Sequence, residues 1–112
     1  MELEVMKPNR LSDGQHAGKI VGVESRDKPF EYVDIVIETN EAREIRAGYP
    51  RILTVESKLG MLLKRFGQQL MEGNIINPEL VLKGKECVFV CINETTNRGT
   101  FPKVISESLK PK

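Results

Sequence analysis

The sequence predicts a mainly β domain of five strands, with one α-helix between the third and fourth strands. Two patterns lead to this prediction. Short segments with apolar residues at every second position, typical of half-buried strands, occupy much of the chain. One segment in the middle has apolar residues spaced three and four apart, as on one face of a helix. A length of 112 residues suits one core, so we expect a single domain over residues 1–112.

The composition favours a folded protein in an aqueous compartment. The chain is 39% hydrophobic and 29% charged, which is too apolar for a disordered segment. No apolar run approaches the ~18 residues that a membrane span requires. The first residues, MELEV, are acidic, whereas a signal peptide begins with basic residues. We therefore expect a soluble cytoplasmic protein that has no membrane partner.

The charges are nearly balanced over the whole chain but not within each half. The total is 17 Lys+Arg against 16 Asp+Glu, a net charge of +1, so a strongly basic nucleic-acid binder is not indicated. Residues 1–56 hold 8 basic and 11 acidic residues, or −3, and residues 57–112 hold 9 and 5, or +4. The preferred interpretation of this difference is an ordinary solvated surface.

The residue types that support metal, disulfide or enzyme chemistry are sparse. Cys87 and Cys91 are four apart in a predicted strand, about 13 Å, and a disulfide needs less than ~7 Å, so we expect two reduced core residues. A zinc site would need further ligands, and His16 is the one histidine. No phosphate-binding or dinucleotide-binding glycine motif is present, nor a Ser or Cys with a recognisable base. We expect a protein without catalysis, metal or cofactor, in which a backbone group satisfies His16.

Three strands are predicted before the helix, at residues 15–25, 32–38 and 44–49. Gly18 or Gly22 marks a bulge or bend in the first of them. The turn at residues 39–41 is short, so the second and third strands should form an antiparallel hairpin. The alternation places on the buried face Val33, Ile35, Ile37, Ile45, Ala47 and Tyr49.

The predicted helix carries its apolar face on Leu59, Leu62, Leu63, Phe66 and Leu70. Its start is capped by Thr54 or Ser57 and its end by Gly67 or Gly73. A proline after Asn77 indicates one further short helical turn.

The last third of the chain predicts a second hairpin. A fourth strand at residues 86–93 is apolar on both faces, which indicates that both faces are covered. A polar loop at residues 93–99 leads to a fifth strand at residues 100–105, where Pro102 indicates an edge or an interruption. The polar tail at residues 106–112 is expected to fray, so the core should span residues 14–105 between a flexible N-terminal lead-in and this tail.

This order of elements resembles a known family of small proteins. The segment LKGKECVF at residues 82–89, the polar turn with Gly99 and the strand FPKV at residues 101–104 resemble the closing hairpin of small OB-fold proteins that bind single-stranded DNA, including replication-protein-A-like and phage-type ones. The resemblance covers residues 14–105. It implies a five-stranded Greek-key barrel and non-catalytic binding of single-stranded nucleic acid, DNA before RNA, in replication, recombination or repair. The chain departs from this pattern because it has no zinc ribbon, no Trp and few aromatic residues.

The resemblance places a binding groove across the second and third strands. The loop between the first and second strands and the loop between the fourth and fifth strands form its walls. Phe30 and Tyr32 are the best candidates for stacking with bases. Phe101 either closes one end of the barrel or flanks the groove. The candidate binding residues are Arg26, Lys28, Phe30, Tyr32, Arg46, Arg98 and Lys103.

Several alternatives stay open at this point. Tyr32 can pack on a neighbouring strand residue, and Phe30 can cover the end of the barrel instead of a base. Acidic residues on the same face, Asp34, Glu38 and Glu44, would repel phosphate. An OB-fold module that binds another protein, or forms a subunit of a larger complex, is the alternative function. Oligomeric state and the choice between DNA and RNA are likewise open.

Overall fold

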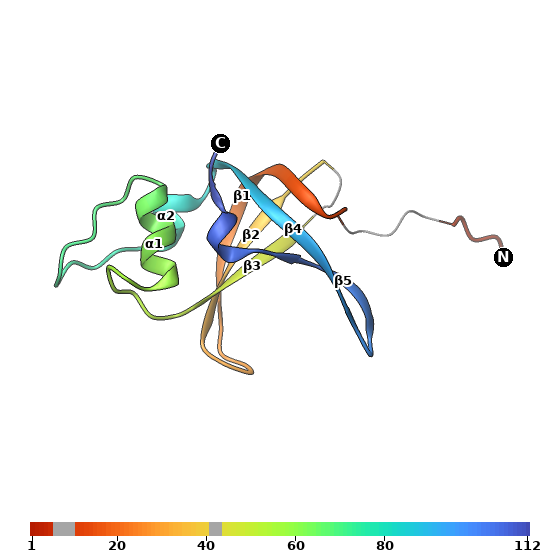
Figure 1. The fold of residues 1–112 in the computed structure, drawn as a ribbon, viewed down its shortest axis with the longest axis horizontal. Coiled ribbons are helices and arrows are strands. Elements are labelled where there is room, and N and C mark those ends of the chain that lie inside the picture. Colours follow the sequence, from red (N-terminus) through yellow and green to blue (C-terminus); the bar gives the residue numbers. More distant parts are fainter. Residues whose placement is uncertain (6–10, 41–43) are drawn as a thin grey trace.

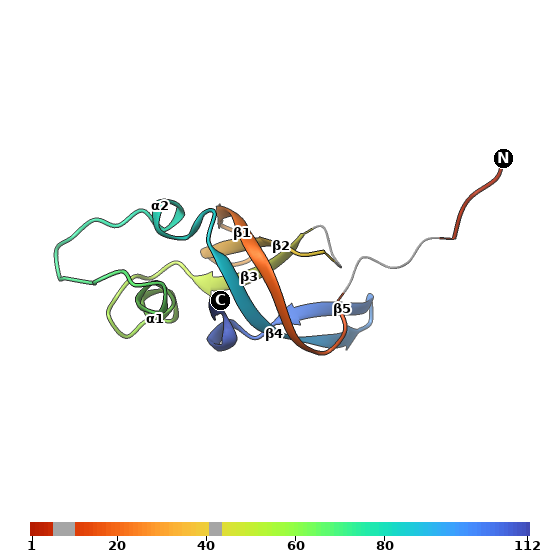
Figure 2. The same ribbon diagram turned by 90° about the horizontal axis from the view of Figure 1, so that it is seen from above.

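The chain forms one antiparallel sheet with two helices at one end (Figures 1 and 2). A computed structural model describes residues 1–5, 11–40 and 44–112. The elements are β1 (Gly14–Arg26), β2 (Tyr32–Glu38), β3 (Ile45–Pro50), α1 (Lys58–Arg65), α2 (Pro78–Leu82), β4 (Glu86–Thr96), β5 (Gly99–Val104), a 3₁₀ turn (Ser106–Ser108) and β6 (Lys110–Pro111). The strand order is β3-β2-β1-β4-β5, and β6 pairs with β4.

The mainly β class is confirmed, and so is the order along the chain, with three strands before the helical segment and two strands after it. The prediction of one helix is corrected, because two helices form. Asn77 caps α2 by accepting a hydrogen bond from the Glu79 amide, so the expected short turn is a helix. Within the described ranges, no helix has the length and apolar character to cross a lipid bilayer.

A bend in β1 lets this strand pair with both halves of the sheet. Its N-terminal half pairs with β4 and its C-terminal half with β2, and the register shifts between Ile20 and Gly22. A Cβ on Gly18 would lie 2.7 Å from Cγ2 of Ile37 and 2.8 Å from the Glu38 carbonyl oxygen. The close approach of β2 therefore requires glycine there, and the predicted bulge is confirmed.

The core lies on one face of the sheet and under the two helices. The alternation in β2 and β3 is confirmed, because the six residues predicted to face inward are all buried. Cys87 and Cys91 are free and buried, as expected. On the opposite face of β2, Asp34 and Val36 are buried as well, at 6% and 4% exposure. The middle of β2 is therefore buried on both faces.

Helix α1 is shorter than the apolar spacing indicates. Ser57 caps it by accepting a hydrogen bond from the Gly60 amide, and Gly67 follows its end with a φ of +88°. Leu70 lies beyond the helix and still packs against the core. A Cβ on Gly60 would lie 1.8 Å from the Thr54 carbonyl oxygen, so the loop before the helix passes directly over this residue.

Both ends of the predicted core need correction. The tail is ordered, because Leu109 is fully buried and Lys110–Pro111 pairs with β4. Leu11 is also buried, and its carbonyl accepts a hydrogen bond from Asn93. Leu11 and Leu109, one buried apolar residue in each polar segment, therefore extend the core beyond residues 14–105. Residues 6–10 of the lead-in lie outside the described residues.

The second hairpin also differs from its prediction. Strand β4 continues to Thr96, so the loop expected at residues 93–99 shortens to a turn at residues 97–98. Ile92 is 42% exposed, so the far end of β4 is not covered on both faces. In the earlier turn at residues 39–41, Glu41 lies outside the described residues.

Candidate nucleic-acid interface

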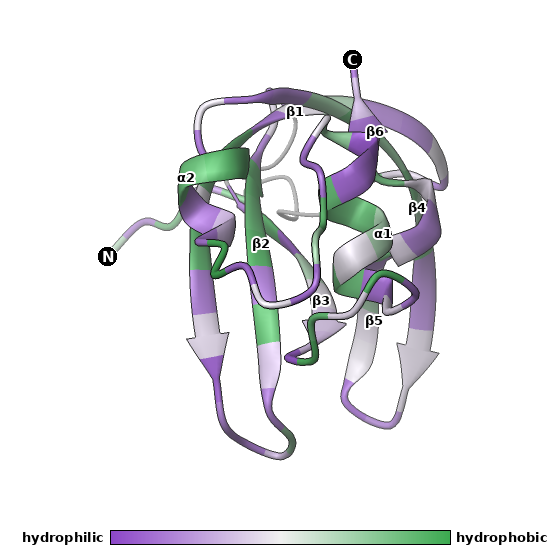
Figure 3. Cartoon of the chain, turned by 90° about the vertical axis from the view of Figure 1, so that its left-hand side faces the viewer, coloured by the Kyte–Doolittle hydropathy of each residue, from purple (hydrophilic) through white to green (hydrophobic). Residues whose placement is uncertain are grey.

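Two hairpins extend from the sheet in the same direction (Figure 1), and in the view of Figure 3 the end of β3 lies between them. One hairpin joins β1 to β2 and the other joins β4 to β5. Strand β3 pairs with β2 and contacts β5. The predicted site residues other than Lys103, which lies farther along β5, therefore fall into three groups: the outer face of β1, β2 and β3, and the two hairpin ends at residues 26–31 and 96–101.

On the outer face, Arg26 is engaged by a buried carboxylate. Its guanidinium lies 3.2 Å from both oxygens of Asp34, through Nη2 and Nε. The Arg26 Cζ atom also lies 4.9 Å from the centroid of the Tyr32 ring. A planar guanidinium over an aromatic face is a favourable cation–π arrangement. The half-buried Tyr32 ring therefore has one face covered by Arg26.

Arg46 lies in the same network and is also neutralised. It forms ion pairs with Glu24 and with Glu44, at 3.1 Å to the latter, and lies 3.9 Å from Asp34. The hydrogen bond that Arg46 donates to Glu24 raises the pKa of Arg46, and the negative charge of Glu24 adds to the effect. Three carboxylates thus face two guanidinium groups on this surface, and a shallow depression over Gly48 lies between them. A phosphate gains little from this face.

The end of the β1–β2 hairpin presents an exposed ring and a cation. Phe30 is 69% exposed, and Lys28 is exposed with no ion pair in the part of the chain that the structure describes. Asp27 and Glu31 both pair with Arg51, at 2.9 and 3.3 Å. Arg51 therefore neutralises the carboxylates beside Lys28. Sequence reasoning missed Arg51, although its place directly after β3 sets it opposite this hairpin.

The end of the β4–β5 hairpin also presents an exposed ring and a cation. Arg98 is exposed, and its side chain has no ion pair among the described residues. Phe101 is 50% exposed, and a Cβ on Gly99 would lie 3.8 Å from its ring. Lys103 is paired with Glu94 at 3.5 Å. The sequence left open whether Phe101 closes one end of the barrel or flanks the groove. The structure places its ring near the turn of the β4–β5 hairpin.

The remaining reactive side chains are engaged within the fold. His16 Nε2 lies 2.7 Å from the Ser12 carbonyl oxygen, which confirms the expected backbone partner. Burial raises the pKa of Cys87 to about 11 and raises the pKa of Cys91 as well, so both stay neutral thiols at pH 7. Across residues 1–5, 11–40 and 44–112, no three His, Cys, Asp or Glu side chains are grouped as metal ligands.

The fold and the site define a small antiparallel β protein that presents rings and unpaired cations at two hairpin ends. No model of a known protein family matches the chain, and no curated protein matches it. The functional proposal therefore depends on the geometry described above.

Proposed function

We propose that the sheet closes into an OB-fold barrel that binds single-stranded nucleic acid without catalysis, acting in the cytoplasm in replication, recombination or repair. The contact between β3 and β5 supports closure, because these strands are the two ends of the sheet order. The pairing of β1 with both β2 and β4 supports it too, since a barrel needs one strand that bends between two halves.

The observation that carries this proposal is that each hairpin end presents an exposed ring and a cation that has no ion pair among the described residues. Phe30 and Lys28 lie at one end, and Phe101 and Arg98 lie at the other. A base stacked on an aromatic ring contributes about 1–3 kcal/mol, and a cation beside the ring attracts the adjacent phosphate. Bases are free to stack in this way only when they are unpaired, so the geometry favours single strands over duplexes.

The ion-paired outer face has a structural role in this account. Arg26 joins β1 to β2 through Asp34, and Arg51 joins the end of β3 to the β1–β2 turn. These contacts fix the direction of the hairpin that carries Phe30. Arg26, Arg46 and Tyr32 then position the interface, and Lys28, Phe30, Arg98 and Phe101 contact the strand.

A fluorescence-anisotropy titration with oligo-dT and with oligo-rU at several salt concentrations tests the proposal. Two unpaired cations predict a shallow salt dependence, with a slope of log K against log salt of about −1.4 for a single strand. The double variant Phe30→Ala with Phe101→Ala should lower affinity by roughly a hundredfold or more, because two stacking contacts are lost. Unchanged binding by this variant, or no saturable binding by the wild type, would contradict the proposal.

Contact with another protein is the second candidate function. The loops around α1 expose Ile52, Leu53 and Val55, an unusual density for a solvated surface. Retention on single-stranded DNA cellulose at low salt, compared with co-purification of a protein, discriminates between the two functions.

A further inference from the structure

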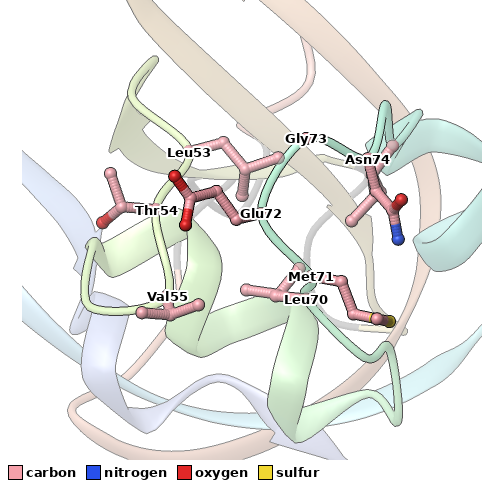
Figure 4. Close-up of a pocket in the computed structure, with 9 residues that line it drawn as sticks. Leu53, Thr54, Val55, Leu70, Met71, Glu72, Gly73 and Asn74 are labelled. Atoms are coloured by element: carbon pink, nitrogen blue, oxygen red, sulfur yellow. The ribbon is translucent and has the colours of Figure 1, made fainter.

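The helical end of the molecule carries an apolar pocket that the proposed function does not use. The pocket has a volume of about 380 Å³ and lies between the β3–α1 loop and the α1–α2 loop (Figure 4). Leu53 and Val55 line it from the first loop, and Leu70, Met71 and Ile76 from the second. Met71 is 65% exposed, and Ile75, which lies in sequence between the lining residues Asn74 and Ile76, is fully exposed. Apolar surface of this extent, grouped around one pocket, is typical of a docking site.

Hydrogen bonds hold the first wall of this pocket in place. The Thr54 carbonyl lies against Gly60 of α1, and Ser57 accepts a hydrogen bond from the Thr54 amide at 3.0 Å. Lys64 donates to the Val55 carbonyl at 2.8 Å. The wall is therefore attached to α1 and its N-cap at three points, Ser57, Gly60 and Lys64.

The N-terminal segment of the chain has the pattern that fits such a pocket. In an extended conformation Met1, Leu3 and Val5 share one side, and Glu2 and Glu4 share the other. The three apolar residues are exposed, at 110%, 83% and 97%. A short extended segment with one apolar side is recognised by a groove that takes alternate side chains.

The segment cannot reach the pocket of its own chain. Leu11 is buried and bonded to Asn93, and from Asn93 back to Glu86 β4 covers roughly 23 Å. The pocket lies beyond that point, at the end opposite to the N-terminal segment (Figures 1 and 2). The link from residue 5 to residue 11 spans at most about 20 Å. This segment can therefore enter the pocket only from a second copy of the chain.

Charge complements this fit. Of the three cations of helix α1, Lys58 pairs with Glu107 and Arg65 donates to the Leu109 and Ser106 carbonyls, which leaves Lys64 on the side of this pocket. Lys64 sits at the rim of the pocket through its bond to Val55, and no ion pair engages it within the described residues. Glu72 lines the pocket as well. An incoming segment should therefore place Glu2 and Glu4 on the side of Lys64.

We propose that residues 1–5 of one copy dock, in extended form, in the pocket between the β3–α1 and α1–α2 loops of a second copy. Each copy then offers one segment and one pocket, so the contact is head-to-tail and forms a closed ring or a growing chain. The contact needs no nucleic acid and leaves both hairpin ends accessible.

A labelled peptide of residues 1–10 tests the pocket directly. The receptor is the full chain with Leu3→Asp, whose own segment no longer competes. We expect saturable binding by fluorescence anisotropy, weakened roughly tenfold or more by a further Val55→Asp, because the new carboxylate would be buried unpaired. The matched control is Leu80→Asp, since Leu80 is 83% exposed and does not line the pocket. Absence of peptide binding, or equal weakening by the control, overturns the proposal.

Sedimentation velocity over a concentration series tests the same contact in the intact chain. The wild type should associate as its concentration rises, and Leu3→Asp and Val55→Asp should each remain monomeric. Circular dichroism and thermal unfolding check that both variants fold, which the exposure of these two residues favours. A monomeric wild type overturns the proposal. So does association that Val55→Asp abolishes and Leu3→Asp leaves intact, because two pockets would then face each other.

Discussion

Cations and aromatic rings lie both on the outer face of β1, β2 and β3 and at the two hairpin ends. Their cations differ, because within the described residues those on the sheet are ion-paired and those at the turns are not. On the sheet, Arg26 and Arg46 lie beside carboxylates held in neighbouring register positions, and both cations are neutralised. At the turns, Lys28 and Arg98 have no cross-strand neighbour and no ion pair in the described chain. The number of cations near a groove therefore does not measure its attraction for phosphate. What matters is which cations lack a partner.

The largest expected effect comes from reversing the charges at the turns. Lys28→Glu with Arg98→Glu should lower oligo-dT affinity by roughly a hundredfold at low salt, because two attractive contacts become repulsive. Anisotropy titration measures this. The control, Lys83→Glu with Lys110→Glu, makes the same change in net charge at the helical end and should alter affinity far less. Equal losses in the two double variants would mean that only net charge matters.

Removing the buried Asp34 carboxylate should give the outer face of the sheet an unpaired cation, as the two hairpin ends already have among the described residues. Asp34→Asn removes the ion pair of Arg26, whereas Arg46 keeps Glu24 and Glu44, so we expect a several-fold gain in affinity and a slope of log K against log salt that steepens by about 0.7, the contribution of one cation. Stability should fall by about 1–3 kcal/mol, because charge-assisted hydrogen bonds are lost. Urea unfolding and anisotropy measure the two effects. A loss of affinity in a folded variant would mean that the Arg26–Asp34 pair matters more for the direction of the β1–β2 hairpin than for the neutralisation of Arg26.

A substitution in the core separates stability from binding. Tyr49 donates to the Ser106 carbonyl at 2.7 Å and ties the C-terminal segment to β3. Tyr49→Phe should lower the free energy of unfolding by about 1 kcal/mol and leave oligonucleotide affinity unchanged, since Arg65 still donates to that carbonyl. Chemical denaturation measures the loss.

The same variant has a predicted pH dependence. Burial raises the pKa of Tyr49 above its ordinary value of 10.0, so its hydroxyl ionises more readily in the unfolded chain. The stability that this group contributes is complete below pH 10 and is lost as the pH rises further. The difference in stability between wild type and Tyr49→Phe should therefore narrow above pH 10. A difference that grows there would contradict this assignment.

The smallest effect is expected on the sheet face. Arg46→Ala removes a cation that Glu24 and Glu44 already neutralise, so affinity should change by less than about twofold. Arg98→Ala is the matched change at a turn and should weaken binding several-fold. The two anisotropy titrations need the same salt concentration. A larger loss for Arg46→Ala would reverse the comparison between the two regions.

The sequence predicts the strands well and the site only in part. The bounds of β2 agree with the predicted ones because its alternation is unbroken. Leu11 and Leu109 escaped prediction because each is a single apolar anchor within a polar segment. The pairing of Arg26 with Asp34 depends on strand register, which the composition of each strand does not reveal. The apolar pocket beside α1 was missed because, apart from Leu70, its apolar lining residues lie off the helical stripe that defines the core.

The most direct test of the central claim is an NMR titration of the ¹⁵N-labelled chain with oligo-dT. The account predicts that the largest amide shifts fall at residues 26–31 and 96–101, with small shifts near Gly48 and none around the α1–α2 loop. Shifts concentrated on the outer face of β2 and β3, with the two turns unperturbed, would contradict it.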